Sequence, residues 1–133
     1  MLQIPQQIIN DLFDHAKIGL PEEVCGYLAG VGREVTRQYR LTNIDHSNEH
    51  FSFDPKEQFQ VVREARKDGL EILANYHSHP ETPARPSQED IRLAFDPNIS
   101  YVIVSLADNL PDVKSFRIEN GEVEKEEIQV IKK

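Results

Sequence analysis

The sequence contains very little cysteine and no long hydrophobic run. Cys25 is the only cysteine among 133 residues, so no intrachain disulfide can form, which is compatible with a reducing cytoplasm. The longest apolar runs, at 24–31 and 101–107, are far too short to span a bilayer. The N-terminal segment has neither a basic region nor a cleavable apolar core, so we expect no secretion signal. Together these absences predict a cytoplasmic protein that has no membrane partner.

Positive charge is also scarce. The chain has 15 Lys and Arg against 23 Asp and Glu, which gives a net charge of −8. Binding to a nucleic-acid backbone needs clustered cations, whereas the basic residues here are scattered among acids, so we expect no nucleic-acid partner. With 38% apolar and 29% charged residues, the composition is typical of a globular protein. The length fits one hydrophobic core, and we therefore predict a single domain over residues 1–133.

The hydrophobic pattern predicts alternating helices and strands. Helices are expected at 5–19, 55–68 and 87–95, and strands at 24–31, 34–44, 70–76, 101–106, 112–119 and 122–131. Asp54 is the predicted N-cap of the second helix, and Phe59, Val62 and Ala65 are its predicted apolar stripe. Helices that interleave with both hairpins and crossovers favour an α/β (mixed α+β) fold, with a mixed sheet flanked by helices.

Residues 75–90, NYHSHPETPARPSQED, combine features of a metal site. His77 and His79 have the spacing of a strand, so we expect both imidazoles on the same face. Zinc binds neutral imidazole nitrogens together with a carboxylate oxygen, and Asp90 is the candidate third ligand if the loop 80–86 folds over. Three prolines restrict that loop, which lowers the entropy lost in closing it. Three protein ligands leave a fourth position for water, as in catalytic zinc sites.

The same residues also have ordinary structural explanations. Ser87 and Asp90 have the spacing of a capping box, with Ser87 as the N-cap of a short helix; this role does not exclude metal binding by Asp90. A zinc-bound water needs a base, and Glu22 and Glu23 are candidates because they precede the strand 24–31. Spacing does not determine whether that strand lies beside the histidine strand. Cys25 is expected in the core, and the remaining histidines are expected at the surface: His15, His46 and His50.

The combination of PEEVCGYLAG, HSHP and SQED resembles the JAMM (MPN-plus) metalloproteases, in their compact stand-alone prokaryotic form. The family pattern is a glutamate before a strand, then His-x-His-x(10)-Asp, with a serine three residues before the aspartate. Glu23, His77, His79, Ser87 and Asp90 fill the five positions. The resemblance implies a cytidine-deaminase-like three-layer sandwich and a Zn²⁺ ion held by His77, His79 and Asp90. It also implies Glu23 as the general acid/base and Ser87 as the hydrogen-bond donor to the developing oxyanion.

The activity that this resemblance implies is hydrolysis of a peptide or isopeptide bond. The compact chain resembles family members that act on ubiquitin-like or sulfur-carrier proteins, so we expect cleavage after a C-terminal Gly-Gly. Such a tail is expected to pair with an exposed strand edge beside the metal. We expect the loops 44–53 and 80–86 to line its groove.

Two other functions are alternatives at this point. A zinc deaminase shares the implied fold, but it needs a Pro-Cys-x-x-Cys pair that the single Cys25 cannot supply. A non-catalytic MPN-type scaffold or interaction domain would be typical of a chain that has lost its zinc ligands. All five family positions are filled here, which favours the enzyme.

Overall fold

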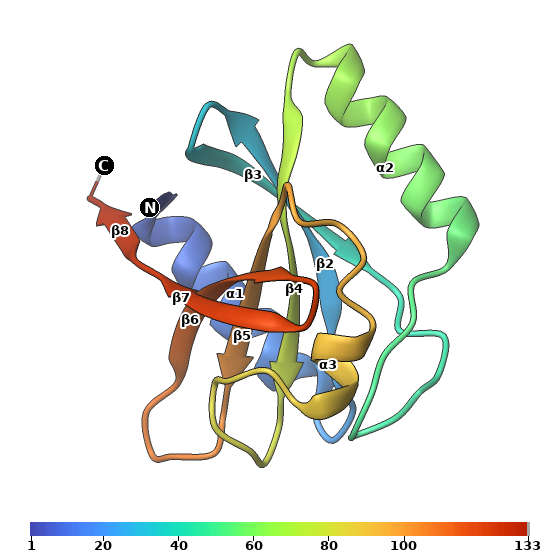
Figure 1. Ribbon diagram of the computed structural model, residues 1–133, viewed down its shortest axis with the longest axis vertical. Coiled ribbons are helices and arrows are strands. Elements are labelled where there is room, and N and C mark those ends of the chain that lie inside the picture. Colours follow the sequence, from blue (N-terminus) through green and yellow to red (C-terminus); the bar gives the residue numbers. More distant parts are fainter. Residues whose placement is uncertain (133) are drawn as a thin grey trace.

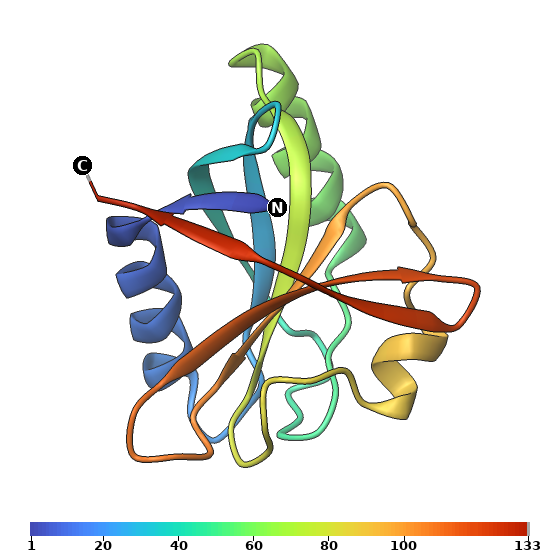
Figure 2. The same cartoon turned by 60° about the vertical axis from the view of Figure 1, so that its left-hand side comes forward.

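The computed structural model describes residues 1–132. Its elements are β1 (Leu2–Pro5), α1 (Gln6–Gly19), β2 (Cys25–Val31), β3 (Glu34–Leu41), α2 (Pro55–Lys67), β4 (Glu71–His79), α3 (Gln88–Arg92), β5 (Ser100–Ser105), β6 (Asp112–Glu119), β7 (Glu122–Glu126) and β8 (Ile128–Ile131). Helix α1 covers one face of the sheet, and α2 and α3 lie against the other (Figures 1 and 2). This arrangement confirms the predicted three-layer fold. None of the helices within the described residues has the length and apolarity that crossing a membrane requires.

The eight strands form one mixed sheet in the order β7-β6-β5-β4-β2-β3-β1-β8. Strand β4 lies in its middle, antiparallel to β2 and parallel to β5. Ala74 and Tyr76 of β4 are buried in the core that also contains Leu12 of α1. Because side chains alternate along a strand, the intervening residues Asn75, His77 and His79 face α2 and α3. The two histidines therefore share the face opposite α1.

Helix α2 confirms its predicted start and corrects its predicted stripe. The Asp54 side chain accepts a hydrogen bond from the Lys56 amide, as expected of the N-cap. The buried residues of the helix are Val61 and Ala65, whereas Phe59 is 66% exposed. The prediction places Phe59 in the buried stripe because Phe59 has helical spacing from Val62 and Ala65. The helix is instead rotated so that Val61 and Ala65 form the side that packs against the sheet.

The strands at the two ends of the chain differ most from the prediction. Strand β1 was not predicted, because four residues leading into a helix carry too little alternation; it pairs in parallel with both β3 and β8. The single strand predicted at 122–131 is two strands on either side of Glu127. Strand β7 pairs with β6, and β8 pairs with β1 at the opposite end of the strand order. The last segment thus crosses from one edge of the sheet to the other (Figure 2).

A half-buried carboxylate stabilises this closing segment. One oxygen of Glu126, Oε1, accepts hydrogen bonds from the Ser100 and Ser115 hydroxyls at 2.6 and 2.8 Å. The other, Oε2, accepts one from the Arg33 guanidinium at 2.8 Å. Burial alone would raise the pKa of Glu126, but these hydrogen bonds and the Arg33 charge lower it overall. The carboxylate form of Glu126 is therefore the one that stabilises the closure.

We predict that Glu126→Gln lowers the free energy of unfolding by about 2 kcal/mol at pH 7, because the amide cannot accept all of these hydrogen bonds. Since the folded-state pKa is lowered, this stabilisation is present above the ordinary carboxyl pKa and is lost as the pH falls through the folded-state value. Denaturant titrations at several pH values measure it. Glu124→Gln, an exposed change on the same strand, should have little effect. Equal stability of wild type and Glu126→Gln at pH 7 would contradict the prediction.

Candidate metal centre

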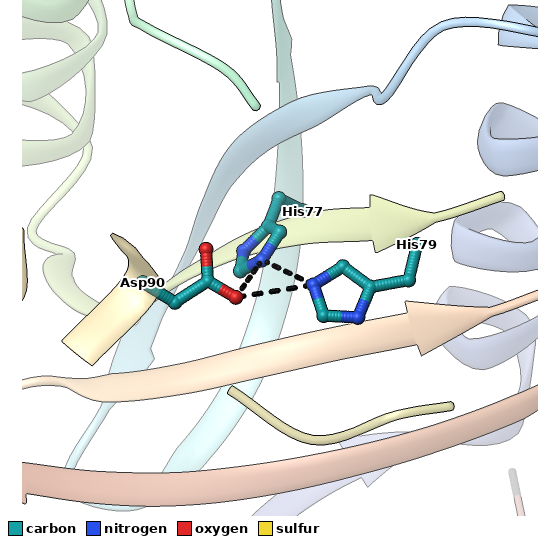
Figure 3. A group of neighbouring side chains, drawn as sticks. All are labelled: His77, His79 and Asp90. Carbon is teal, nitrogen blue, oxygen red and sulfur yellow. Dashed lines mark hydrogen bonds and ion pairs between the residues drawn. The ribbon is translucent and has the colours of Figure 1, made fainter. Parts of the chain in front are cut away.

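Three ligand atoms converge where β4 ends and α3 begins. His77 Nε2, His79 Nε2 and Asp90 Oδ2 lie 3.1 Å from one another in all three pairs (Figure 3). Zinc bonds of about 2.0–2.1 Å in a tetrahedron separate neighbouring ligand atoms by about 3.3 Å. The spacing therefore suits one small cation bound by all three residues. The two histidines are 3% and 4% exposed, so the centre is also largely shielded from solvent.

The proton positions of the set fit a cation as well. His79 Nδ1 lies 2.9 Å from the Pro83 carbonyl oxygen, which can only accept a hydrogen bond. Nδ1 therefore carries the proton, and in neutral His79 the lone pair on Nε2 points at the centre. Asp90 Oδ2 is also an acceptor, so two electron-rich atoms face each other at 3.1 Å. A positive charge between them, either a proton or a metal ion, is needed to stabilise this arrangement.

The charges around the site point to the same requirement. Burial alone would raise the pKa of Asp90, but its hydrogen bonds with His77 and His79 hold that pKa well below the usual range. Burial alone would lower the pKa of His79, but Asp90 and the Pro83 carbonyl raise it overall. The site thus keeps Asp90 ionised and attracts positive charge to His79. This donor set fits Zn²⁺, which is bound by imidazole nitrogen and carboxylate oxygen.

Strand pairing brings Glu23 to this centre. Cys25 of β2 lies opposite His77 of β4 in the antiparallel register. The pairing continues beyond β2, because Ser78 N donates to Val24 O at 3.0 Å and Val24 N donates to the Ser78 hydroxyl at 2.8 Å. Continuing by one more residue puts Glu23 level with His79, and alternation puts it on the same face as Cys25. Residue spacing did not determine whether the strand after Glu23 lies beside the histidine strand; the observed pairing of β2 with β4 shows that it does.

Burial raises the pKa of the Glu23 carboxyl group when no metal is bound. The residue is 5% exposed, and Oε1 has no hydrogen-bond partner among the described residues. Burial raises the pKa of Glu23 to about 8; the His79 charge opposes this rise and nearby acids add to it. Glu22 is half-buried and instead contacts His46 at 3.3 Å. Of the two candidate bases, only Glu23 faces the metal ligands.

The capping box and the set of candidate metal ligands share one residue, Asp90. The Ser87 hydroxyl accepts from the Asp90 amide at 3.0 Å, and Asp90 Oδ2 accepts from the Ser87 amide at 2.9 Å, as predicted for a capping box. Oδ2 is also the atom that meets both histidines. The cap therefore fixes the direction of the Asp90 carboxylate. The exposed Ser87 lies immediately beside it, at the first turn of α3.

Sequence reasoning missed an aromatic contact with the metal site. The Phe51 ring stacks on the His77 ring, with a centroid distance of 4.6 Å and an interplanar angle of 25°. Phe53 packs against both Phe51 and Tyr27. Two phenylalanines at alternate positions in an otherwise polar loop were the available signal. They attach the loop to the sheet face that carries the histidines.

A cavity of about 410 Å³ opens beside His77 and Asp90. Both predicted loops contribute to its wall, with Phe51, Ser52 and Phe53 from one and Pro86 from the other. Most of its remaining wall is apolar or aromatic: Tyr27, Leu93, Phe95, Ile99, Tyr101, Ile103 and Ile118. The buried Asn75 Oδ1 has no hydrogen-bond partner among the described residues, and Asn75 also lines the cavity. The site therefore has an adjoining space that suits an apolar group together with an N–H donor.

The structure corrects the expected strand edge beside the metal and the expected surface position of His15. The strand edge is absent, because β2, β4 and β5 are each paired on both sides within the described sheet. His15 is not a surface residue: it is half-buried, and its Nδ1 lies 2.7 Å from the Tyr76 hydroxyl. His46 and His50 are exposed, and Cys25 is fully buried, as predicted. Burial raises the pKa of the Cys25 thiol to about 12, so the thiol is a core group rather than a reactive one.

Known proteins resemble this chain along nearly its whole length. A family model for prokaryotic homologues of the JAB domain matches residues 5–119. A CysO-cysteine peptidase from Mycobacterium tuberculosis is 36% identical over 135 residues, covering 98% of this chain and 92% of that protein. A probable TtuB-protein conjugate cleaving protease from Thermus thermophilus is 35% identical over 123 residues, covering 92% and 79%.

Solved structures agree. A solution structure from Desulfitobacterium hafniense is 47% identical, with a TM-score of 0.91, and the match covers 100% of this chain and 94% of that one. A JAB1/MPN domain protein from Archaeoglobus fulgidus has a TM-score of 0.68 at 22% identity, and the match covers 98% and 99% of the two chains. At that identity the second match shows the fold alone.

We predict that metal-free Glu23→Gln is more stable than metal-free wild type near neutral pH. The Glu23 pKa is about 8 in the folded protein against an ordinary 4.5, so ionisation favours the unfolded state as the pH rises from 4.5 towards 8. At about 1.4 kcal/mol per pKa unit, the gain is on the order of 3 kcal/mol at pH 7. Denaturant titrations in chelator measure this gain, which should disappear at pH 4. Glu81→Gln is an exposed control. A difference that does not depend on pH would refute the burial explanation.

Proposed function

This chain belongs to the prokaryotic homologues of the JAB domain, a stand-alone JAMM (MPN-plus) family, and we propose that it is a zinc metallopeptidase. Its proposed reaction is hydrolysis of the peptide or isopeptide bond after the C-terminal Gly-Gly of a ubiquitin-like or sulfur-carrier protein. The observation that carries the proposal is the convergence of His77, His79 and Asp90 at 3.1 Å with a buried carboxyl group on the same sheet face. The names of the two relatives, a CysO-cysteine peptidase and a TtuB-protein conjugate cleaving protease, support the same class of substrate.

His77, His79 and Asp90 are the proposed holders of the zinc ion. When bound, zinc supplies Lewis-acid chemistry, lowering the pKa of water and polarising a carbonyl group. The Pro83 carbonyl keeps His79 in the tautomer that exposes Nε2. The Ser87 amide orients the Asp90 carboxylate, and Phe51 fixes the plane of the His77 ring. These contacts set the ligand directions before any cation binds, so little ordering is required on binding.

Glu23 is the proposed proton-transfer group. Its carboxyl group is buried on the same sheet face as the metal ligands; a bound cation would favour the ionised form, which can first accept a proton and later return it. Oε1 has no protein partner among the described residues, so this atom is available to the reacting groups. Ser87 is exposed at the first turn of α3, and we assign its hydroxyl to the developing oxyanion. Glu23 returns the proton to the leaving amine.

The cavity is the proposed site for the acyl side of the substrate. Its lining includes His77 and Asp90 but neither Glu23 nor His79. Because Glu23 must lie next to the leaving nitrogen, the leaving group belongs on the Glu23 side and the Gly-Gly tail on the cavity side. Two glycines carry no side chain past the crowded centre. An apolar residue before them would fill the aromatic wall, while Asn75 Oδ1 would accept a backbone N–H.

The alternatives are weaker on these observations. A scaffold would not require a buried carboxyl group, a metal-binding set and a cavity at one place. A deaminase of the related fold uses cysteine ligands, and the single Cys25 is buried with its pKa raised to about 12. We also propose that residues 1–133 form one catalytic domain in the cytoplasm. The family match over residues 5–119 and the disulfide-free Cys25 support this.

We predict that the zinc-loaded protein cleaves Gly-Gly-terminated carrier proteins that are extended or conjugated at their C-terminus. Mass spectrometry of the products should show a carrier that ends in Gly-Gly. A matched carrier whose tail ends in Ala-Ala should be cleaved at least about 10-fold more slowly, because two methyl groups would crowd the centre. Equal rates on the two carriers would exclude the assigned tail specificity.

Variants at the centre should separate metal binding from proton transfer. His77→Ala and Asp90→Ala are expected to lose both zinc and activity, because each removes one of three ligands. Glu23→Gln is expected to keep one zinc per chain while kcat falls by about 10²-fold or more. Zinc content by mass spectrometry and steady-state kinetics measure the two effects. A fully active Glu23→Gln protein would mean that another group transfers the proton, and a wild-type protein that binds no zinc would exclude the metallopeptidase.

A further inference from the structure

The buried side-chain amide of Asn43 links the Glu23 backbone to the loop that carries Phe51. Asn43 follows β3 and is 6% exposed. Its Nδ2 donates its two shortest hydrogen bonds to the Glu23 carbonyl at 3.0 Å and to the His50 carbonyl at 3.1 Å; the Ser47 carbonyl is a more distant acceptor at 3.5 Å. The first bond reaches the backbone of the proposed proton-transfer residue. The second reaches the residue before Phe51, which stacks on the ligand His77.

The other end of the amide orders the loop itself. Asn43 Oδ1 accepts from the Asp45 amide at 3.0 Å and from the Ser52 amide at 3.3 Å. The loop in turn holds Glu23 directly, because Glu23 N donates to the Ser47 carbonyl at 2.8 Å. The Glu23 N–H is therefore bound by this loop, and the Glu23 C=O is bound by the Asn43 side chain. Asn43 in this way links the Glu23 backbone to the loop that holds it.

The location of Glu23 explains why such an anchor is needed. The hydrogen bonds between β2 and β4 place Glu23 level with His79 but end at Val24, so the backbone N–H and C=O of Glu23 itself are held by other partners. A carboxyl group misplaced by about 1 Å loses much of its catalytic effect. An amide is suited to the task, because it offers two donors and an acceptor without adding charge. An aspartate here would add a further carboxylate to a region that already contains Glu23 and Asp90.

We propose that Asn43 is a positioning residue of this site, which sets the backbone of Glu23 and the stacking of Phe51 on His77 by anchoring the loop 44–52. The inference rests on the proposed function, since it assigns Glu23 the proton transfer. A purely structural role for Asn43 would predict lower stability without a specific loss of turnover. The two roles are distinguished by kinetics together with a measurement that does not depend on activity.

The test compares Asn43→Asp, Asn43→Ala and Ser115→Ala in the full zinc-loaded chain. Asn43→Asp keeps the acceptor for Asp45 and Ser52 but removes the donors to Glu23 and His50. Ser115→Ala removes a buried hydrogen bond to Glu126 that involves none of the proposed site residues, so it controls for lost stability. For both Asn43 variants we expect kcat to fall about 10- to 100-fold, with KM changed less than about threefold and one zinc per chain retained. Ser115→Ala should keep the wild-type kcat.

Amide hydrogen exchange followed by NMR supplies the second readout. Asn43→Asp should speed exchange at the Glu23 amide about 10-fold or more while leaving the Asp45 and Ser52 amides protected. Asn43→Ala should speed exchange at all three amides. A wild-type kcat in either Asn43 variant would overturn the inference, as would unchanged exchange at Glu23 or loss of zinc together with activity. A wild-type protein that cleaves no carrier would instead contradict the proposed function, and exchange alone would then decide whether Asn43 anchors Glu23.

Discussion

The pairing of β2 with β4 is the constraint on which the rest of the site depends. Cys25 opposite His77 implies Glu23 beside His79, and a shift of one residue would turn Glu23 towards α1. The residue between the two histidines secures this register. Ser78 is fully buried; its amide donates to Val24 O, and its hydroxyl accepts from Val24 N. The serine of the His-Ser-His stretch therefore fixes the strand that brings the carboxyl group.

Within the described part of the chain, buried polar atoms that have no hydrogen-bond partner gather at the site. Glu23 Oε1 and His77 Nδ1 are buried without partners among the described residues, and Asn75 Oδ1 in the adjoining cavity is a third such atom. Buried polar groups are normally paired, so their gathering around one centre marks a place where stability is given up for chemistry. Elsewhere the polar groups are better satisfied: Glu126 has three hydrogen-bonding partners, in the segment of the chain that joins both edges of the sheet.

Sequence patterns predict the structure correctly where a feature depends only on residues close together in the chain. The capping box of Ser87 and Asp90, the Asp54 N-cap and the strand spacing of His77 and His79 depend on neighbours a few positions away. Patterns failed where a distant segment decides the outcome. Strand β1 forms because β3 and β8 pair with it. The segment after Asn120-Gly121 forms two strands because its first part pairs with β6 and its second part pairs with β1. Phe59 is exposed because the sheet contacts another side of α2.

Local sequence patterns are enough to predict the chemical groups of the site: two imidazoles on one strand face, a carboxylate held by its own helix cap, and candidate acids before a small-residue strand. Those features are local, since strand alternation and helix capping act over two to four residues. The residue pattern left Glu22 and Glu23 open, and the family resemblance selected Glu23; the fold agrees, because Glu23 is buried on the ligand face while Glu22 contacts His46. The stacking of Phe51 on His77 and the bridging role of Asn43 follow from the tertiary structure alone. The Asn43–Glu23 and Phe51–His77 contacts link residues 20 or more positions apart in sequence, so they depend on strand register and loop closure, which no short pattern encodes.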